Sequence, residues 1–348
     1  MADYYVQYAL HSEALLTTNV QEILQPLDSW LVAFSEYFSP ESLIDNVIPI
    51  IGTIDVELMG EMAVTLGLLN VISSVIKWVF PVHRPTWWIR ENNHRSINIK
   101  QSPFSCDTSP GFPSAHSMSF TGFVFIFLLY LNLSPRNRWL AVTLLSIPTW
   151  IACVYFGSHF LHQCICGSIV AVLVIESIRR RRQKQMQQQP PSREGAGAGV
   201  ICMKSWRKIT AIAAVTTLGL FVIGMYFAML YAGLDPHWSV RMAFKWCPDP
   251  YYLRHETSPI FIMCRDLGFM MGVALSSPFT NRLHQRLEPK KSIPAVVVIV
   301  AVGFFIRSNT PKNYGRVVFV GYEFIRNAMH SYSLLTILPN LCKKNKSS

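Results

Sequence analysis

Two histidines stand where strongly apolar segments of the chain begin. His116 lies in PGFPSAHSM, which runs directly into SFTGFVFIFLLYLNL, and His159 lies in VYFGSHFLHQ at the start of a later apolar segment. An imidazole ring can attack phosphorus as a nucleophile or transfer a proton near neutral pH. A single histidine at a helix end is usually structural, so the pair indicates a site only if other suitable residues join it.

Two cations precede the first histidine, in the stretch KWVFPVHRP. Pro81 and Pro85 disfavour helix at the residues before them, so the helix that carries Lys77 should end near Phe80. Arg84 would then extend from the turn that follows. Alternatively, both cations snorkel at a helix end beside an aromatic belt made of Trp78, Trp87 and Trp88.

The serine of the PSAH stretch, Ser114, is placed to cap the helix that follows it. A helix N-terminus presents unpaired backbone N–H groups and the positive end of the helix dipole, which suit a phosphate. Ser114 can also donate to an anion, or it can serve as a cap alone. A further histidine, His162, follows His159 on a neighbouring helical face.

Taken together, these residue types predict a phosphomonoester site. One imidazole would attack phosphorus to form a phosphohistidine, and the other would protonate the leaving oxygen. The cations and backbone N–H groups would stabilise the charge on the equatorial oxygens. This chemistry needs no metal and the sequence shows no metal-ligand pattern, so we expect neither a metal nor a cofactor.

The composition indicates a protein of the lipid bilayer. Of 348 residues, 51% are hydrophobic and only 15% are charged, whereas soluble domains carry about 25% charged residues. The net charge of +11 is concentrated in short runs such as RRRRQK and KKNK. A nucleic-acid partner is not expected, because its binding face would need basic residues spread over a solvated surface.

Apolar segments of about 20 residues predict transmembrane helices. We predict an all-α, polytopic membrane protein with about nine spans, at 30–53, 61–80, 117–133, 139–157, 159–178, 208–233, 258–278, 293–307 and 316–340. The first and last spans contain charged residues, which should face the bundle interior because charge is costly in lipid.

The whole chain, 1–348, is predicted to form one membrane domain. The segments within it are a catalytic core at 61–178, a flexible cytoplasmic linker at 179–207, C-terminal helices at 208–340 and a cytoplasmic tail at 341–348. The linker prediction rests on the polar, low-complexity stretch QKQMQQQPPSREGAGAGV.

The distribution of Lys and Arg predicts the orientation, since cytoplasmic loops are enriched in positive charge. The runs SPRNR, RRRRQK and RLHQR fall on the same side as the C-terminal KKNK, which we therefore place in the cytoplasm. The N-terminus and loops 81–116 and 234–257 lie on the opposite side. Loop 81–116 is basic there against the rule, and a bound anion would explain the exception.

The pattern K-x6-RP, then PSxH, then a later histidine resembles the type-2 phosphatidic acid phosphatase superfamily, which includes the vanadium haloperoxidases. The stretches CDTSPGFPSAHSM and YFGSHFLHQ, with nine spans and a lysine-rich tail, resemble the glucose-6-phosphatase family over roughly 30–340. The resemblance implies a phosphatidic acid phosphatase-like helical core in which Lys77, Arg84 and Ser114 hold the phosphate. It implies His159 as the nucleophile and His116 as the proton donor.

Two departures from the family pattern bear on activity. The family glycine between Ser and His is Ala115, which costs about 1 kcal/mol if the position needs a positive φ. The family arginine six residues before His159 is Cys153. A neutral thiol cannot replace a guanidinium that binds phosphate through two hydrogen bonds.

The resemblance implies a hydrolase that releases glucose and phosphate from glucose 6-phosphate in the lumen of the endoplasmic reticulum. The sugar phosphate, membrane lipids and a glucose 6-phosphate transporter are the implied partners, and the tail KNKSS resembles a retrieval signal for that compartment. One alternative is a sugar-phosphate-binding or regulatory homologue impaired by Cys153. A lipid phosphatase is the other, although such enzymes usually lack the extended C-terminal half.

In that oxidising compartment, the two cysteines of the lumenal loops, Cys106 and Cys247, could form a disulfide. Such a bond would join loop 81–116 to loop 234–257. Both cysteines could also remain free.

Overall fold

The computed structural model describes residues 2–94, 96–187, 208–277, 289–311 and 315–341, and they contain helices but no β-strand. The N-terminal half contains α1 (Ala2–Leu24), α2 (Asp28–Tyr37), α3 (Pro40–Ser42), α4 (Ile48–Gly52), α5 (Val56–Val79), α6 (Pro85–Glu91), α7 (Ala115–Tyr130), α8 (Pro135–Tyr155) and α9 (Leu161–Gln187). The C-terminal half contains α10 (Lys208–Tyr231), α11 (Trp238–Trp246), α12 (Pro259–Ser276), α14 (Pro289–Ser308), α15 (Arg316–Tyr332) and α16 (Leu338–Leu341).

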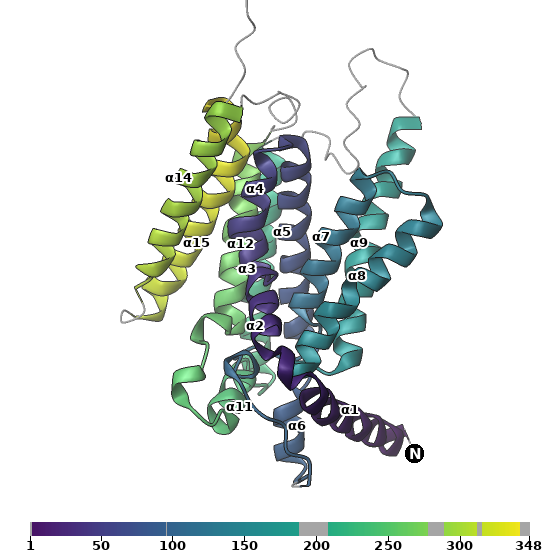
Figure 1. The fold of residues 1–348 in the computed structure, drawn as a ribbon. Coiled ribbons are helices and arrows are strands. Elements are labelled where there is room, and N and C mark those ends of the chain that lie inside the picture. The colour runs from purple at the N-terminus through teal and green to yellow at the C-terminus, as the bar shows by residue number, and fades with distance from the viewer. Residues whose placement is uncertain (1, 95, 188–207, 278–288, 312–314, 342–348) are drawn as a thin grey trace, which may run out of the picture.

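Helix α5 occupies the centre of the bundle, with α7 on one side and α12 on the other (Figure 1). Most of its residues are apolar and buried, and its start is capped by Asp55, whose carboxylate accepts from the N–H of Leu58 at 2.9 Å. Helices α8 and α9 pack against α7, and α10 and α15 pack against α12. The two halves of the chain therefore meet along α5.

Six of the described helices are long and apolar enough to cross a membrane. They are α5, α8, α10 and α12, together with the segments Leu161–Lys184 of α9 and Lys291–Ser308 of α14. Helix α7 is apolar but shorter. The all-α membrane architecture is confirmed, whereas the count of nine spans is not.

The two remaining predicted spans, 30–53 and 316–340, have interrupted or polar helices. The first is divided into α2, α3, a π-helical turn at Leu43–Val47 and α4. The second is formed by α15, a π-helical turn and α16. Several of their charges form ion pairs: Asp45 lies 3.7 Å from Arg326, which also pairs with Glu323 at 2.8 Å, and 3.1 Å from Arg307 of α14.

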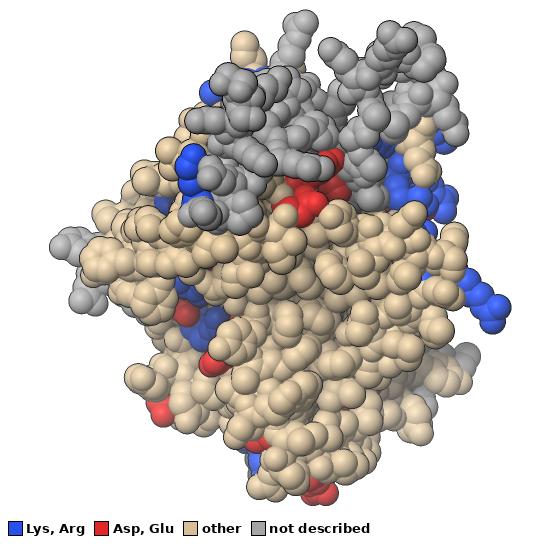
Figure 2. All heavy atoms as spheres, turned by 45° about the horizontal axis from the view of Figure 1, so that its top comes forward, with Lys and Arg blue, Asp and Glu red and all other residues tan. Residues whose placement is uncertain are grey.

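The outer helices turn apolar side chains outward. Ile209, Leu220 and Phe227 of α10 are exposed, as are Phe304 and Phe305 of α14. Figure 2 shows one face of the molecule, where uncharged residues form a broad continuous area. Such a surface suits lipid, since large exposed apolar areas are uncommon on soluble monomers.

The predicted linker begins inside a helix. Helix α9 continues through the arginine run at 179–182 to Gln187. Glu176 pairs there with Arg179 at 2.7 Å and with Arg180 at 3.0 Å. The rest of the predicted linker, 188–207, lies outside the described residues, as does the KNKSS tail.

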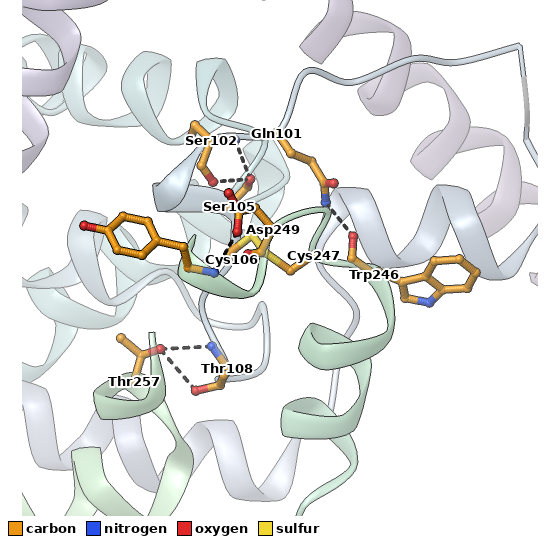
Figure 3. The surroundings of a disulfide bond; sticks show 10 residues. Gln101, Ser102, Ser105, Cys106, Thr108, Trp246, Cys247, Asp249 and Thr257 are labelled. Carbon is orange, nitrogen blue, oxygen red and sulfur yellow. Dashed lines mark hydrogen bonds between the residues drawn. A yellow bond between two sulfur atoms is a disulfide. The ribbon is translucent and has the colours of Figure 1, made fainter. Parts of the chain in front are cut away.

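Short helices and loops gather at the end of the bundle where the N-terminus lies. The short helices α6 and α11 are found there, together with the longer α1 (Figure 1). The disulfide predicted between Cys106 and Cys247 is confirmed, with their Cα atoms 5.6 Å apart. It joins the loop before α7 to the loop after α11 (Figure 3).

Loss of this disulfide should destabilise the protein. Cys106→Ser or Cys247→Ser opens a covalent link across 141 residues, and removal of such a link typically reduces the free energy of unfolding by about 2–5 kcal/mol. The measurement is the apparent thermal midpoint in detergent under non-reducing conditions. Cys166→Ser, which changes a free cysteine of α9, is the control. Equal midpoints for all three variants and the wild type would contradict the prediction.

Candidate active site

One pocket at the N-terminal end of the bundle brings together four of the five predicted site residues. Lys77, Arg84, His116 and His159 all line it, and its empty volume of about 490 Å³ is partly open to solvent. They come from the end of α5, the start of α6, the start of α7 and the turn before α9. Three sequence segments distant from one another therefore meet at one end of the bundle, where the predicted topology placed them.

The two cations are buried rather than snorkelling. The exposed fraction is 4% for Lys77 and 1% for Arg84. The aromatic belt considered as an alternative is wrong, because Trp78, Trp87 and Trp88 are all buried as well. Buried cations need partners or a ligand, since their desolvation is costly.

The end of α5 occurs where the prolines predict it. The helix ends at Val79, Phe80 follows as its cap, and Arg84 adopts an extended backbone before α6. Lys77 Nζ donates to the carbonyl oxygen of Pro110 at 2.6 Å. Burial, as the largest cause, lowers the pKa of the Arg84 guanidinium, and Asp107 opposes that shift.

The loop between α6 and α7 holds Arg84 through several contacts. Its Nε donates to the carbonyl of Ser109 at 2.8 Å, and one terminal nitrogen donates to the carbonyl of Ser158 at 2.9 Å. The other terminal nitrogen donates to Ser109 Oγ at 3.0 Å and lies 3.3 Å from Asp107 Oδ2. The guanidinium is thus fixed at the pocket wall.

The His159 ring is oriented by a backbone carbonyl. Its Nδ1 lies 2.7 Å from the carbonyl oxygen of Gly111, which can only accept, so Nδ1 carries the proton in the neutral ring. Nε2 then holds the lone pair. Burial, reinforced by Arg84 and Lys77, lowers the pKa of His159 well below its usual value, which keeps the ring neutral and nucleophilic at neutral pH.

Gln163 and Gly111 hold this arrangement together. The Gln163 side chain accepts from the N–H of Phe160 at 3.1 Å and donates to the carbonyl of His83 at 3.0 Å. A Cβ at Gly111 would lie 2.8 Å from that same carbonyl oxygen and 2.9 Å from the Gln163 amide nitrogen. Only glycine fits at this close approach, which explains the glycine of the PGFPSAH stretch.

His116 lies in the first turn of α7, half-buried at the pocket wall. Ser114 caps this helix, accepting from the N–H of Ser117 at 3.3 Å. It is fully buried and is not part of the pocket lining. Its capping role is confirmed, whereas its predicted contact with phosphate stays a prediction.

The two departures from the family pattern have different consequences. Ala115 is the first residue of α7 and is absent from the positive-φ residues, so alanine fits without strain. Cys153 is 5% exposed, its Sγ lies 3.8 Å from Ser114 Oγ, and it does not line the pocket. The thiol therefore fills space behind the capping serine and contributes no donor to the site.

His162 lies outside the pocket. Its Nδ1 is 2.9 Å from a carboxylate oxygen of Glu13 in α1. The structure thus separates the two histidines of the SHFLH stretch: one lines the pocket and the other ties α9 to the N-terminal helix.

Several charged residues of the pocket were missed from the sequence. They are Glu41, Asp107, Arg254, Arg265 and Asp266. Arg265 pairs with both Glu41 and Asp266, and Ser74 Oγ donates to Asp266 at 2.6 Å. The only sequence signal for part of this set was the charge within predicted spans, which pointed to the bundle interior.

Comparison with known proteins assigns the chain to a class. A family model described as the PAP2 superfamily matches residues 59–187, which include every predicted site residue. The helical core at 59–187 is thus similar to that of the PAP2 superfamily. No solved structure matches the chain.

Several curated relatives that are similar to the chain are glucose-6-phosphatases. Glucose-6-phosphatase catalytic subunit 1 of Haplochromis nubilus is 25% identical over 289 residues, 77% of each chain. Glucose-6-phosphatase 2 of Homo sapiens is 29% identical over 225 residues, 59% of this chain and 58% of the relative. The mouse protein of that name is 25% identical over 285 residues, 76% of this chain and 75% of the relative. The chain is therefore similar to glucose-6-phosphatases over about three quarters of its length.

Proposed function

We propose that the protein hydrolyses glucose 6-phosphate to glucose and phosphate through a phosphohistidine at His159. The observation that carries the proposal is the pairing of a neutral, oriented imidazole with buried cations in one pocket: the Nδ1 contact with Gly111 at 2.7 Å leaves Nε2 free. The names of the curated relatives support the choice of substrate.

In the first step, Nε2 of His159 attacks phosphorus in line with the bond to the sugar oxygen. The N–P bond forms as the P–O bond breaks, and protonated His116 gives its proton to the departing oxygen. Lys77 and Arg84 stabilise the negative charge on the equatorial oxygens, because phosphoryl transfer is catalysed mainly by positioning and by stabilising this charge.

In the second step, water attacks the phosphohistidine. The neutral His116 left by the first step accepts a proton from that water as the O–P bond forms and the N–P bond breaks. Phosphate leaves, His159 is neutral again, and His116 is protonated as at the start. Each residue acts in both steps, so the cycle closes without any other group.

The sugar would lie against the polar wall formed by α5 and α12. Asn70, Ser73 and Ser74 line the pocket there, with the carboxylates of Glu41 and Asp266. The Ser73 hydroxyl is buried and has no hydrogen-bond partner among the described residues. Hydroxyl groups of a hexose suit such a wall, because each can donate to a carboxylate and accept from a serine.

The membrane orientation belongs to the same proposal. The pocket would open to the lumen of the endoplasmic reticulum, and the C-terminus would lie in the cytoplasm. The disulfide between Cys106 and Cys247 supports a lumenal position for that end, because disulfides persist in oxidising compartments. A substrate delivered from the cytoplasm would require a glucose 6-phosphate transporter as partner.

A second candidate function is a sugar-phosphate-binding or regulatory homologue. Cys153 favours it, because a thiol stands where the family pattern has an arginine and the thiol does not reach the pocket. A lipid phosphatase is less well supported, since the polar wall suits a sugar better than acyl chains.

The test is an assay of phosphate release in microsomes that express the full chain. Glucose 6-phosphate is compared with fructose 6-phosphate, glycerol 3-phosphate and phosphatidic acid at mildly acidic to neutral pH. We expect hydrolysis of glucose 6-phosphate, increased when detergent opens the vesicles. No release by the wild type, together with release by Cys153→Arg, would overturn the proposal and support the regulatory homologue.

A further inference from the structure

The pocket contains a guanidinium that the family motifs do not supply. Arg254 belongs to the loop between α11 and α12, far from the motifs in sequence, yet it lines the pocket with Arg84 and His159. We propose that Arg254 binds the substrate phosphate in place of the family arginine that Cys153 replaces. This inference rests on the proposed function, since it assigns a residue of the same site.

Arg84 alone has little capacity left for phosphate. A guanidinium has five N–H donors, and the protein engages four of those of Arg84: one on Nε, one on the first terminal nitrogen and two on the second. One donor remains. Binding phosphate through two hydrogen bonds from a guanidinium therefore requires a second arginine.

Arg254 has the free donors that Arg84 lacks. Its side chain is 26% exposed, against 1% for Arg84. One terminal nitrogen lies 3.4 Å from Asp107 Oδ1, and Nε lies 3.7 Å from Glu256. Within the described part of the chain, its other terminal nitrogen makes no hydrogen bond or ion pair. That nitrogen keeps both N–H groups for a ligand.

Asp107 holds the two arginines beside each other. One of its oxygens is 3.3 Å from Arg84 and the other is 3.4 Å from Arg254. Lys77 lines the same pocket, so three cations accompany this carboxylate there. The excess of positive charge suits a phosphate dianion, which would bring its own two negative charges to this group.

Hydrogen bonds fix the backbone of Arg254, and its ion pairs with Asp107 and Glu256 orient the guanidinium. Its N–H donates to the carbonyl of Cys106 at 3.4 Å, and its own carbonyl accepts from Thr108 Oγ1 at 2.9 Å and Thr257 Oγ1 at 2.7 Å. Thr257 Oγ1 also accepts from the N–H of Thr108 at 2.9 Å, next to the disulfide (Figure 3). Preorganised donors are those that contribute most to stabilising a transition state.

The test compares Arg254→Gln with Arg241→Gln in the full chain. Arg241 is a matched control, because it is an arginine of the preceding α11 that pairs with Asp235 and stands outside the pocket. We expect Arg254→Gln to lower kcat/KM for glucose 6-phosphate about 100-fold, as loss of one preorganised donor does, and Arg241→Gln to leave it unchanged. Equal activity of the two variants would overturn the inference.

Rescue experiments separate phosphate binding from a structural role. Guanidinium ion added to Arg254→Ala should restore activity, and so should Cys153→Arg introduced into Arg254→Gln, because it returns a guanidinium to the family position. If Arg254 only supported Asp107, neither would restore turnover. The guanidinium titration decides the matter if the double variant does not fold.

A binding measurement distinguishes failure of the inference from failure of the proposed function. Orthovanadate, a phosphate analogue, should raise the thermal midpoint of the wild type and of Arg241→Gln but not that of Arg254→Gln. This outcome supports phosphate binding by Arg254 even if the wild type releases no phosphate. Absence of phosphate release would contradict the proposed hydrolysis but not this binding role. An equal vanadate effect in all three proteins would overturn the role of Arg254.

Discussion

His159→Asn should abolish phosphate release and remove the phosphoenzyme. The asparagine amide nitrogen lies close to the position of Nδ1 and can keep the hydrogen bond to the Gly111 carbonyl, but the variant has no atom equivalent to Nε2. Loss of a nucleophile that acts with its partners as a unit costs on the order of 10⁴-fold or more in kcat. Turnover should therefore fall below detection.

The measurement has two parts, phosphate release and covalent labelling. Glucose 6-phosphate with a radioactive phosphate group is mixed with the protein, the reaction is quenched at alkaline pH, and the label is followed on a gel. Label should appear in the wild type, disappear on acid treatment as phosphohistidine does, and be absent from His159→Asn. A labelled His159→Asn variant would refute the assignment of the nucleophile.

His162→Asn is the matched control for that variant. It makes the same change three residues later, at a histidine that pairs with Glu13 and stands outside the pocket. We expect it to retain both labelling and turnover. Equal losses in the two variants would show that the region, rather than Nε2 of His159, determines activity.

The sequence predicted most residues of the candidate site because they lie at helix ends with strong local signals. The prolines that flank Arg84 end α5 where expected, and Ser114 caps α7 where expected. Each signal depends on a few neighbouring residues, so it can be recognised in the sequence without knowledge of the tertiary structure. That the three segments share one end of the bundle followed from the alternation of spans across the membrane.

The polar wall of the pocket and the position of Arg254 could not be predicted from such local signals. Glu41 and Arg265 pair across a long sequence separation, and each looks like an isolated charge in an otherwise apolar segment. Arg254 shares the predicted loop 234–257 with Arg241 and Lys245, and the sequence does not show which of them reaches Asp107. Such pairings depend on which faces of distant helices meet, which one sequence does not specify.

The predicted count of nine spans is not confirmed, because average hydropathy does not reveal where a helix is interrupted. Segment 30–53 is apolar enough on average, but Phe38 and Ser39 end α2 and a capped new helix begins at Pro40. This break has a consequence for the site, since it brings Glu41 of the next helix into the pocket lining. A continuous helix would have placed that carboxylate differently.

His116→Ala should give a loss that depends on the leaving group. A general acid contributes typically 10²- to 10⁴-fold to the rate, so hydrolysis of glucose 6-phosphate should fall by about that factor. With p-nitrophenyl phosphate the departing oxygen is stable without a proton, and phosphorylation of His159 should proceed almost normally. The hydrolysis of the phosphohistidine should remain slow, because His116 also removes a proton from the attacking water.

The expected signature of His116→Ala is therefore a burst. Mixing this variant with p-nitrophenyl phosphate should release about one nitrophenolate per active site quickly, followed by slow turnover while the phosphohistidine accumulates. The wild type should show less accumulation under the same conditions. His83→Ala is the comparison, since His83 is half-buried near the pocket but does not line it. Equal losses of activity toward both substrates, without a burst, would show that His116 is not the proton donor. Its position in the first turn of α7 would then indicate a role in substrate binding.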